Sequence, residues 1–264
     1  MFASVCSKDD FHHDANRRST GPSIPALVKI EPGSSTAFPF NLQYRLARIA
    51  KYVNGGDWLD LGCADGGYSA GLLDVGAKSV TGVEVEEDRV QAARERHPDI
   101  PFHVSDGASI PFTEGSFDGV FMNEVLEHVD NEDETLDDVY RVLRPGGLII
   151  VISPNRWFPF EGHRVQIGRW SSNKPTLIIP WLPRSITNDW VTARNYWPHE
   201  MRNKIESRGF TILETGFIMP VLEAYPWMPE AFTKRFRRHI TAIDHWPVFR
   251  RFGVSNLVIG RRQD

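Results

Sequence analysis

The sequence predicts an α/β fold whose centre is a mostly parallel sheet. Between residues 58 and 152, short apolar segments with strand character alternate with segments of helical period. Strand, helix and strand in this rhythm join through right-handed crossovers, which makes neighbouring strands parallel. Residues 147–152 (GLIIVI) form an uninterrupted apolar run, as is typical of a strand buried on both faces. The 264 residues suit one large α/β domain, or one domain with a substantial insertion.

The alternating part begins with a helix. Leu42, Leu46 and Ile49 recur at helical spacing within residues 40–53, which predicts an amphipathic helix, and the Asn-Gly-Gly run at 54–56 ends it. The strands expected after this helix are 58–61, 79–84, 102–104, 117–122 and 147–152. The helices expected between them are 67–75, 88–96 and 134–143.

The alternation stops after the fifth strand. Residues 154–197 are rich in proline, tryptophan and arginine and have no clear period, and a segment this long is typical of a functional cap rather than a plain connection. A helix over 198–208 and strands over 210–218 and 254–259 follow, which brings the predicted strands to seven. Residues 227–251 are expected to be largely helical and basic.

The first 36 residues differ from this domain. They are rich in serine, proline, glycine and charge, so we expect a flexible tail over 1–36 and one domain over 37–264. The composition of the whole chain, with 41% hydrophobic and 24% charged residues, is ordinary for a globular protein. Its formal net charge is -4, so the chain has no overall positive charge to attract nucleic acid, and we expect no nucleic-acid partner.

Cysteine usage and hydropathy indicate a cytoplasmic setting. Cys6 and Cys63 are the two cysteines, too few for a disulfide framework in a chain of this length. The first residues lack the apolar run of a signal peptide, and no segment approaches the roughly 20 apolar residues of a membrane span. The oligomeric state is left open.

The strongest local signal is the run WLDLGCADGG at 58–67. An apolar strand leads directly into a glycine turn and a helix, and Gly62 allows a sharp turn with space for a ligand. Glu84 and Asp106 end the next two strands, so both are expected at the carboxyl edge of the sheet, where ligands bind. A glycine turn taken alone is equally consistent with a plain strand-to-helix connection.

Four segments together resemble the class I S-adenosylmethionine-dependent methyltransferases, in particular the type 11-like small-molecule members. They are LDLGCADG at 59–66, VTGVEVEE at 80–87, VSDGASIPFTEGSFDGVFMNEVLEHV at 104–129 and RVLRPGGLIIVISPN at 141–155. The resemblance covers roughly residues 40–155 and continues more weakly in the two C-terminal strands. It implies a Rossmann-like, doubly wound fold and S-adenosylmethionine as the cofactor.

The resemblance also implies roles for individual positions. Asp60 and Gly62 would line the methionine side of the cofactor, and Glu84 would hold the ribose hydroxyls. Val85 would pack on the adenine, and Asp106 would accept a hydrogen bond from the adenine amine. The other cofactor-binding positions that the match implies are Cys63, Ala64, Asp65, Gly107, Ala108, Asn123, Glu124 and Val125.

One position departs from the family pattern. Most members have a second glycine where this chain has Ala64, and an alanine is tolerated there if its backbone keeps a negative φ. A dehydrogenase that uses NAD is the competing enzyme class, but it requires Gly-x-Gly-x-x-Gly to hold a pyrophosphate, and the run LGCADGG at 61–67 lacks that spacing.

Candidate catalytic residues lie on the acceptor side. His163 follows the fifth strand and is a candidate general base, because its ordinary pKa lies near 6.5, and Glu161 could orient it or act itself. His128 completes a Glu-x-x-Glu-His pattern near the cofactor and is a weaker candidate. Arg156 and Arg164 could hold a carboxylate or phosphate of the acceptor. We expect no metal site.

The acceptor is the least constrained part of the prediction. The run PNRWFPFEGH at 154–163 loosely resembles bacterial cell-envelope glycan methyltransferases, which implies O-methylation of a sugar or glycan hydroxyl and a place in polysaccharide biosynthesis. The many aromatic residues of the cap also suit a quinone or another small aromatic or lipid-like acceptor. A non-catalytic protein that binds the cofactor or a partner is a third alternative. The basic runs at 234–239 and 249–252 could contact an anionic membrane surface.

Overall fold

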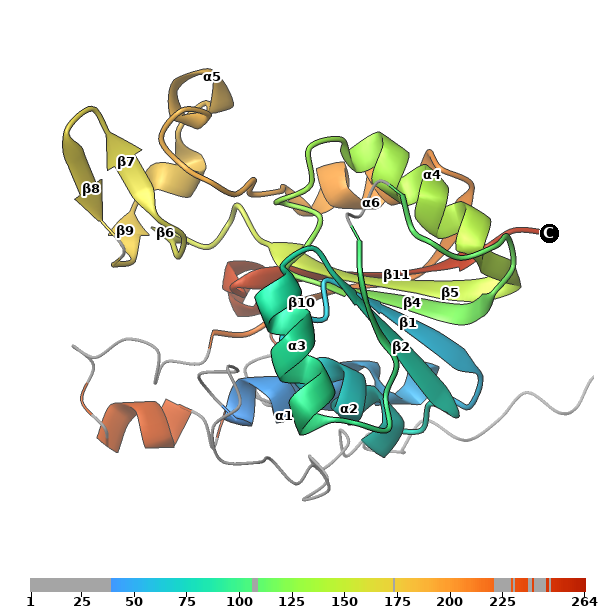
Figure 1. The fold of residues 1–264 in the computed structure, drawn as a ribbon. Coiled ribbons are helices and arrows are strands. Elements are labelled where there is room, and N and C mark those ends of the chain that lie inside the picture. The colour runs from blue at the N-terminus through green and yellow to red at the C-terminus, as the bar shows by residue number, and fades with distance from the viewer. Residues whose placement is uncertain are drawn as a thin grey trace, which may run out of the picture.

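The computed structural model describes residues 39–105, 109–172, 174–220, 229, 231–236, 239, 246 and 248–264. Its centre is a seven-stranded sheet (Figure 1). The strands are β1 Asp57–Leu61, β2 Ser79–Glu84, β3 Phe102–Val104, β4 Phe117–Asn123, β5 Leu143–Pro154, β10 Phe210–Ile218 and β11 Ser255–Arg262.

The strand order and directions confirm the predicted doubly wound sheet. The order is β10-β11-β5-β4-β1-β2-β3, so the chain starts near the middle, builds outward to β3, and then returns to build the other half. β11 runs antiparallel to both of its neighbours, and the pairs among β1 to β5 are parallel. The carboxyl ends of β1, β2, β4 and β5 therefore meet at one edge.

Helices cover both faces of the sheet (Figure 1). On one face lie α4 (Glu132–Val142) and α6 (Pro198–Glu206), and on the other α1 (Pro39–Ile49), continued by the 3-10 turn η1 (Ala50–Tyr52), and α2 (Gly67–Asp74). A further helix, α3 (Glu87–Arg96), packs against the edge strand β3. Each face thus has its own apolar core, and the sheet separates the two cores.

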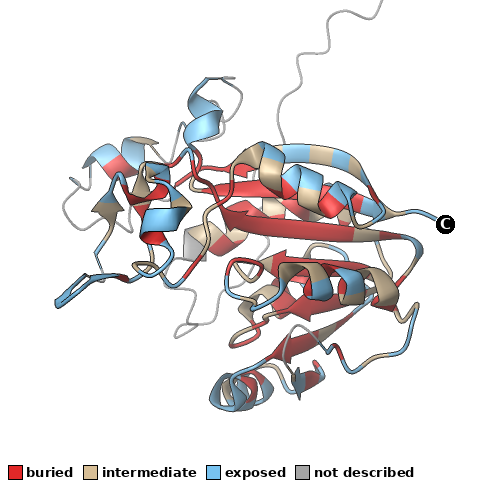
Figure 2. Ribbon diagram, turned by 90° about the horizontal axis from the view of Figure 1, so that it is seen from above, coloured by how far each residue is buried: buried red, intermediate tan, exposed pale blue. Residues whose placement is uncertain are grey.

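The strand β5 shows why the apolar run predicted a doubly buried strand. Ile149 and Val151 contribute to the core beneath α4 and α6, whereas Ile150 and Ile152 contribute to the core beneath α1 and α2. Figure 2 shows the buried residues concentrated along the central strands, with exposed residues on the outer helix surfaces. The observed strand is longer than predicted because β4 and β11 both pair with it.

The helix α4 begins two residues earlier than predicted. The side chain of Asn131 accepts hydrogen bonds from the backbone amides of Asp133 and Glu134, at 3.1 and 3.3 Å. Such a cap satisfies amides that the first helical turn leaves without partners. The three acidic residues of that turn also favour its positive dipole end.

The predicted cap follows β5 and consists of very short elements (Figure 1). They are β6 Phe160–Glu161, β7 Val165–Ile167, β8 Trp170–Ser172, β9 Thr176–Leu177, η2 Ile179–Trp181 and α5 Arg184–Thr187. Elements of two to four residues are too short to impose a period on the sequence, which explains the irregular pattern. Both ends of the cap are held together, because Asn155 and Tyr196 form a bridge and Arg156 N donates to Tyr196 O at 3.0 Å.

Parts of two predicted segments lie outside the described residues. The predicted tail at 1–36 is one of them, and about half of the predicted basic helix at 227–251 is the other. Within the latter, residues 231–236 are helical and η4 (Phe249–Phe252) is a 3-10 turn. Among the described residues, no helix is both long enough and apolar enough to cross a membrane.

Candidate functional site

The turn after β1 opens the candidate site. Gly62 has φ +76°, in the left-handed region, and the amides of Gly62 and Cys63 both donate to Val83 O, at 2.7 and 3.0 Å. A Cβ atom at position 62 would overlap the side chain of Val125, which follows β4. Glycine is therefore required here both by the backbone conformation and by the close approach of the two loops.

Ala64 does not meet the condition under which an alanine is easily tolerated. That condition was a negative φ, but the φ of Ala64 is +49°, in the left-handed region. Its amide donates to Glu84 Oε2 at 3.0 Å. This charge-assisted hydrogen bond offsets the conformational cost, which for a non-glycine residue is of order 1–3 kcal/mol.

Glu84 is buried at the carboxyl end of β2, and backbone amides hold its carboxylate in place. Besides the bond from Ala64 to Oε2, the amides of Val85 and Glu86 donate to Oε1, at 2.8 and 3.2 Å. Three amide donors fix the orientation of the group before any ligand arrives. Each carboxylate oxygen can accept more than one hydrogen bond, so the group can still accept from a ligand diol.

Asp60 is a second buried carboxyl group at this edge. Ser69 Oγ of α2 donates to its Oδ2 at 2.6 Å, and burial raises the pKa of Asp60 to about 7, with the charge of Glu84 contributing in the same direction. Burial likewise raises the pKa of the neighbouring Cys63 thiol. A cationic ligand group would favour the ionised form of Asp60.

The remaining positions of the predicted cofactor site have different environments. Asp65 forms an ion pair with Arg96 of α3, so its carboxylate helps to hold the loop. The side chain of Val85 is 62% exposed at the end of β2, which leaves apolar surface available for a ring. Asp106, Gly107 and Ala108 lie outside the described residues.

A buried arginine fixes the residues after β4. Arg45 Nη1 donates to Asn123 Oδ1 at 2.6 Å and to Glu124 Oε1 at 2.8 Å. Its other nitrogens donate to Asn41 Oδ1 at 3.0 Å and Ser255 Oγ at 3.3 Å. Burial alone would raise the pKa of Glu124, but the Arg45 charge and the hydrogen bonds outweigh it and lower this pKa. Glu124 is held at φ +56° by these contacts.

The two main candidates on the acceptor side are hydrogen-bonded to each other. His163 Nδ1 lies 2.8 Å from Glu161 Oε1, and the backbone amide of His163 donates to the same oxygen at 2.9 Å. The buried Glu161 also accepts from Asn195 Nδ2 at 2.5 Å. Burial would lower the pKa of His163, but the bond to Glu161 and its charge raise it overall. Glu161 therefore orients the imidazole and stabilises its charged form.

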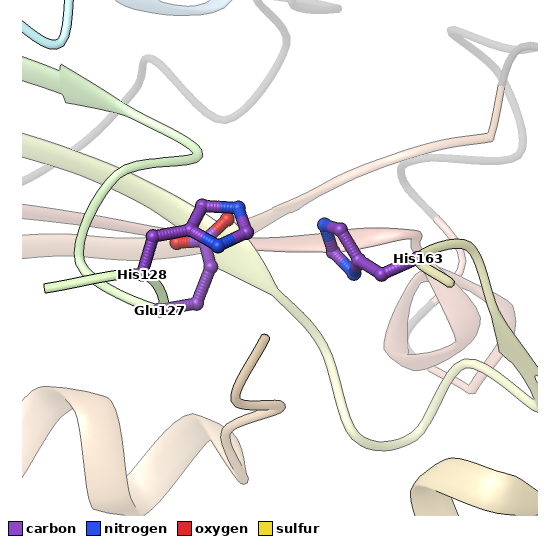
Figure 3. A group of neighbouring side chains, drawn as sticks. All are labelled: Glu127, His128 and His163. Carbon is purple, nitrogen blue, oxygen red and sulfur yellow. The ribbon is translucent and has the colours of Figure 1, made fainter. Parts of the chain in front are cut away.

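The third candidate, His128, faces this pair (Figure 3). The rings of His128 and His163 are nearly perpendicular, with centroids 5.3 Å apart. Glu127 is buried beside them, and Ser153 Oγ donates to its Oε2 at 3.1 Å. Ligand atoms of Glu127, His128 and His163 all lie within 4.8 Å of one another. Residues far apart in sequence thus form one polar cluster.

A pocket of about 400 Å³ opens between this cluster and the cap. Glu127 and His128 line one side, and arginine, asparagine and threonine side chains dominate the other. The cap residues concerned include Arg156, Arg184, Thr187, Asn188, Thr192, Arg194 and Asn195. The polar lining suits an acceptor that carries hydroxyl groups.

The predicted anion-binding arginines occupy different places. Arg156 is buried and donates to Pro180 O and Leu182 O of the cap, at 2.7 and 2.6 Å. Its guanidinium also lies over the ring of Trp197, 5.2 Å from the centroid. Arg164 is exposed and does not line the pocket. Holding the cap together is therefore an observed role of Arg156.

Two residues of the site were missed by sequence reasoning. Arg45 stands three positions after Leu42 and four before Ile49, within the apolar face of its helix, and a charged residue there must find a buried partner. Glu127 stands three positions after Glu124, so this spacing indicated paired carboxyl groups. Both features are visible in the sequence, but the residues that pair with Arg45 and Glu127 come from distant segments.

Known proteins match part of this chain. Residues 59–151 match the family model described as a methyltransferase domain. A protein of Mycolicibacterium smegmatis, named a probable S-adenosylmethionine-dependent methyltransferase, is 35% identical over 109 residues, which is 41% of this chain and 42% of the relative. A demethylmenaquinone methyltransferase of Beutenbergia cavernae is 36% identical over 105 residues, covering 39% of this chain and 43% of the relative.

A third relative matches over a longer segment. The 2-methyl-6-phytyl-1,4-hydroquinone methyltransferase of a Synechocystis species is 30% identical over 172 residues, which is 64% of this chain and 48% of the relative. The matched segment spans less than half of the length of each of these three relatives. Among solved structures, an S-adenosylmethionine-dependent methyltransferase of Mesorhizobium loti has the same fold, with a TM-score of 0.59, 19% identity, and coverage of 84% of this chain and 98% of that one.

Proposed function

We propose that the chain is a class I S-adenosylmethionine-dependent methyltransferase that transfers a methyl group to an oxygen of a small molecule bound beneath the cap. The observation that carries this proposal is the Glu161–His163 pair, whose imidazole faces His128 of the loop that follows β4. S-adenosylmethionine is the cofactor, and it supplies a sulfonium-bound methyl group that is already activated for transfer.

The residues at the sheet edge fit this cofactor. Glu84 would accept hydrogen bonds from the ribose hydroxyls, because its carboxylate is preorganised by three amides. Asp60, a buried carboxyl group with a hydroxyl as partner, would meet the cationic ammonium group of the methionine part. The turn at Gly62, which packs closely against Val125, would run beside the methionine part, and exposed Val85 would pack on the adenine.

The other positions in the predicted set support the same site. Asp65 forms an ion pair with Arg96, and Asn123 accepts a hydrogen bond from Arg45, so both would hold the loops in shape. Asp106 would accept from the adenine amine. The remaining positions are proposed as backbone or packing contacts: Cys63, Ala64, Gly107, Ala108, Glu124 and Val125.

On the acceptor side, the chain must position a hydroxyl and remove its proton. The bond from Nδ1 to Glu161 leaves Nε2 of His163 as the nitrogen that can accept this proton. His128, whose ring faces His163, would help to position the acceptor oxygen. His163 and His128 are thus the proposed catalytic residues, and Glu161 orients the first of them.

A sugar or glycan hydroxyl is the proposed acceptor. The supporting observation is the pocket, whose arginine, asparagine and threonine side chains can hydrogen-bond several hydroxyl groups. A quinol or another small aromatic acceptor is the second candidate, and two features favour it. Two of the relatives are named as quinone-pathway methyltransferases, and Trp157, Trp170 and Trp181 of the cap are exposed.

The first experiment is a calorimetric titration of the full chain with S-adenosylhomocysteine, with NAD as the control. Saturable binding of the first ligand and none of the second is expected. Glycans, quinols and small phenols are then incubated with the protein and methyl-labelled S-adenosylmethionine, and label is measured in each acceptor. Label in quinols alone would reject the glycan proposal, and absence of cofactor binding would reject the methyltransferase proposal itself.

A further inference from the structure

We propose that Glu127, His128 and His163 bind one divalent transition-metal ion beside the pocket that Glu127 and His128 help to line. The three side chains come from the loop between β4 and α4 and from the cap, and they converge on one point (Figure 3). Two imidazoles and one carboxylate form a ligand set typical of zinc, iron, manganese or cobalt ions. Nothing in the local sequence indicated this site, and the proposal replaces the expectation of no metal.

The imidazole of His163 is already oriented as in metal-binding histidines. One ring nitrogen of His163 is bonded to Glu161, and Asn195 in turn holds that carboxylate at 2.5 Å. The His128 ring lies nearly perpendicular to it, with centroids 5.3 Å apart. Metal-binding histidines usually bond their second nitrogen to a carboxylate or a backbone carbonyl, which fixes the tautomer and presents the other nitrogen to the ion.

Glu127 supplies the independent observation. Its carboxyl group is buried, and Oε2 accepts from Ser153, but Oε1 is buried without a hydrogen-bond partner among the described residues. An unsatisfied buried carboxylate oxygen is costly, and a cation removes this cost. A proton shared with the nearby Glu124 is the alternative way to neutralise this oxygen, and it predicts no metal binding.

The spacing is compatible with an ion after side-chain rotation. Tetrahedral bonds of about 2.1 Å place the ligand atoms about 3.4 Å apart. The observed atoms lie within 4.8 Å, so rotations that shorten the longest separation by up to about 1.4 Å would be needed. Glu127 and His128 line the pocket, and the remaining coordination positions would therefore face the acceptor.

The role of the ion deepens the proposed function and depends on it. An acceptor hydroxyl bound to a divalent cation becomes more acidic, so its O–H bond breaks and the proton passes to solvent. The oxygen keeps the electron pair of the O–H bond and uses a pair to form the new C–O bond. The C–S bond breaks, and its electron pair stays with sulfur. With an ion on Nε2, His163 binds the metal instead of accepting the proton.

Metal binding is tested without reference to activity. The full chain is freed of metal with a chelator, desalted, and titrated with Zn²⁺ and with Co²⁺ in a calorimeter. One ion per chain is expected, and the Co²⁺ form should show visible absorption. Glu127→Gln, His128→Gln and His163→Gln should each weaken binding at least tenfold, and Glu161→Gln should weaken it about 10–100-fold, as expected for a partner of a metal ligand.

His199→Gln is the matched control, because His199 is an exposed histidine of α6 outside the pocket. It should bind both ions like the parent chain. Binding of S-adenosylhomocysteine by every variant shows that the variant is folded, and it tests the proposed function separately. No saturable metal binding, binding unchanged in both Glu127→Gln and His163→Gln, or full methyl transfer by the metal-free protein would overturn the proposal.

Discussion

At the scale of single residues, hydrogen bonds fix the orientation of buried charged groups at the sheet edge. The carboxylate of Glu84 accepts three backbone amides, and the guanidinium of Arg45 is bonded to Asn123 and Glu124. Charges fixed in this way need little reorganisation when a ligand binds, which favours affinity. The same fixing places Ala64 and Glu124 at positive φ, a conformation that only surrounding contacts can maintain.

The Glu84→Ala variant should weaken binding of S-adenosylhomocysteine by about 1–3 kcal/mol, the usual loss for charge-assisted hydrogen bonds. Calorimetric titration measures this change. Glu86→Ala is the control, because the Glu86 side chain is exposed and forms a surface ion pair with Arg89, 2.9 Å away. Equal affinity of Glu84→Ala and the parent chain would show that the ribose assignment is wrong.

Asp60 gives the stability of the protein a specific dependence on pH. Its pKa is about 7 in the folded chain, whereas the unfolded chain releases this proton near the ordinary value of 3.8. Between these values the folded state holds more protons, so the contribution of Asp60 to the free energy of unfolding falls as pH rises, by up to about 1.4 kcal/mol per pH unit.

Urea unfolding of the parent chain and of Asp60→Asn at several pH values from 4.5 to 8 tests this dependence. The stability difference between them should shift in favour of the variant as pH rises to about 7, and then level off. A difference that stays constant over this range would mean that Asp60 is ionised in the folded protein throughout.

At the scale of elements, most boundaries follow local signals, and the deviations have local causes. α4 begins early because Asn131 caps it, and β5 extends to Pro154 because two neighbouring strands pair with it. The cap has no periodic signal because its strands and its single α-helix are two to four residues long. Its position instead depends on specific bonds at its two ends, such as Arg156 N to Tyr196 O.

The Asn131→Ala variant should lower the free energy of unfolding by about 1 kcal/mol, the typical cost of losing an N-cap side chain. Urea unfolding measures this cost, and Asn131→Asp, which keeps an acceptor oxygen, should stay close to the parent chain. The cap assignment is wrong if the alanine and aspartate variants are equally stable.

At the scale of the whole molecule, the sheet and the cap have different proposed roles. The carboxyl edge of the sheet presents the carboxylates proposed to hold the cofactor, whereas the cap closes over the pocket proposed for the acceptor. The His128–His163 cluster lies where these two parts meet (Figure 3). Changes in the cap should therefore affect the acceptor step while leaving cofactor affinity intact.

The Arg156→Ala variant tests this division. It removes two hydrogen bonds from a buried charge to the cap, worth about 1.5–3 kcal/mol each, so methyl transfer should fall roughly tenfold or more. Affinity for S-adenosylhomocysteine should remain within about twofold of the parent value, as measured by calorimetry. A parallel loss of cofactor affinity would mean that cap and sheet edge are coupled.

The amino-acid sequence by itself determined the fold and the sheet edge at which we propose that the cofactor binds. Alternating apolar segments, the glycine turn at Gly62 and the acidic strand end at Glu84 are local features, because strand period, turn conformation and charge are properties of short segments. Only the tertiary structure decided which side chains meet. Arg45 with Glu124, and Glu127 with His128 and His163, come from segments that the fold brings together, and neither composition nor local spacing encodes such a contact.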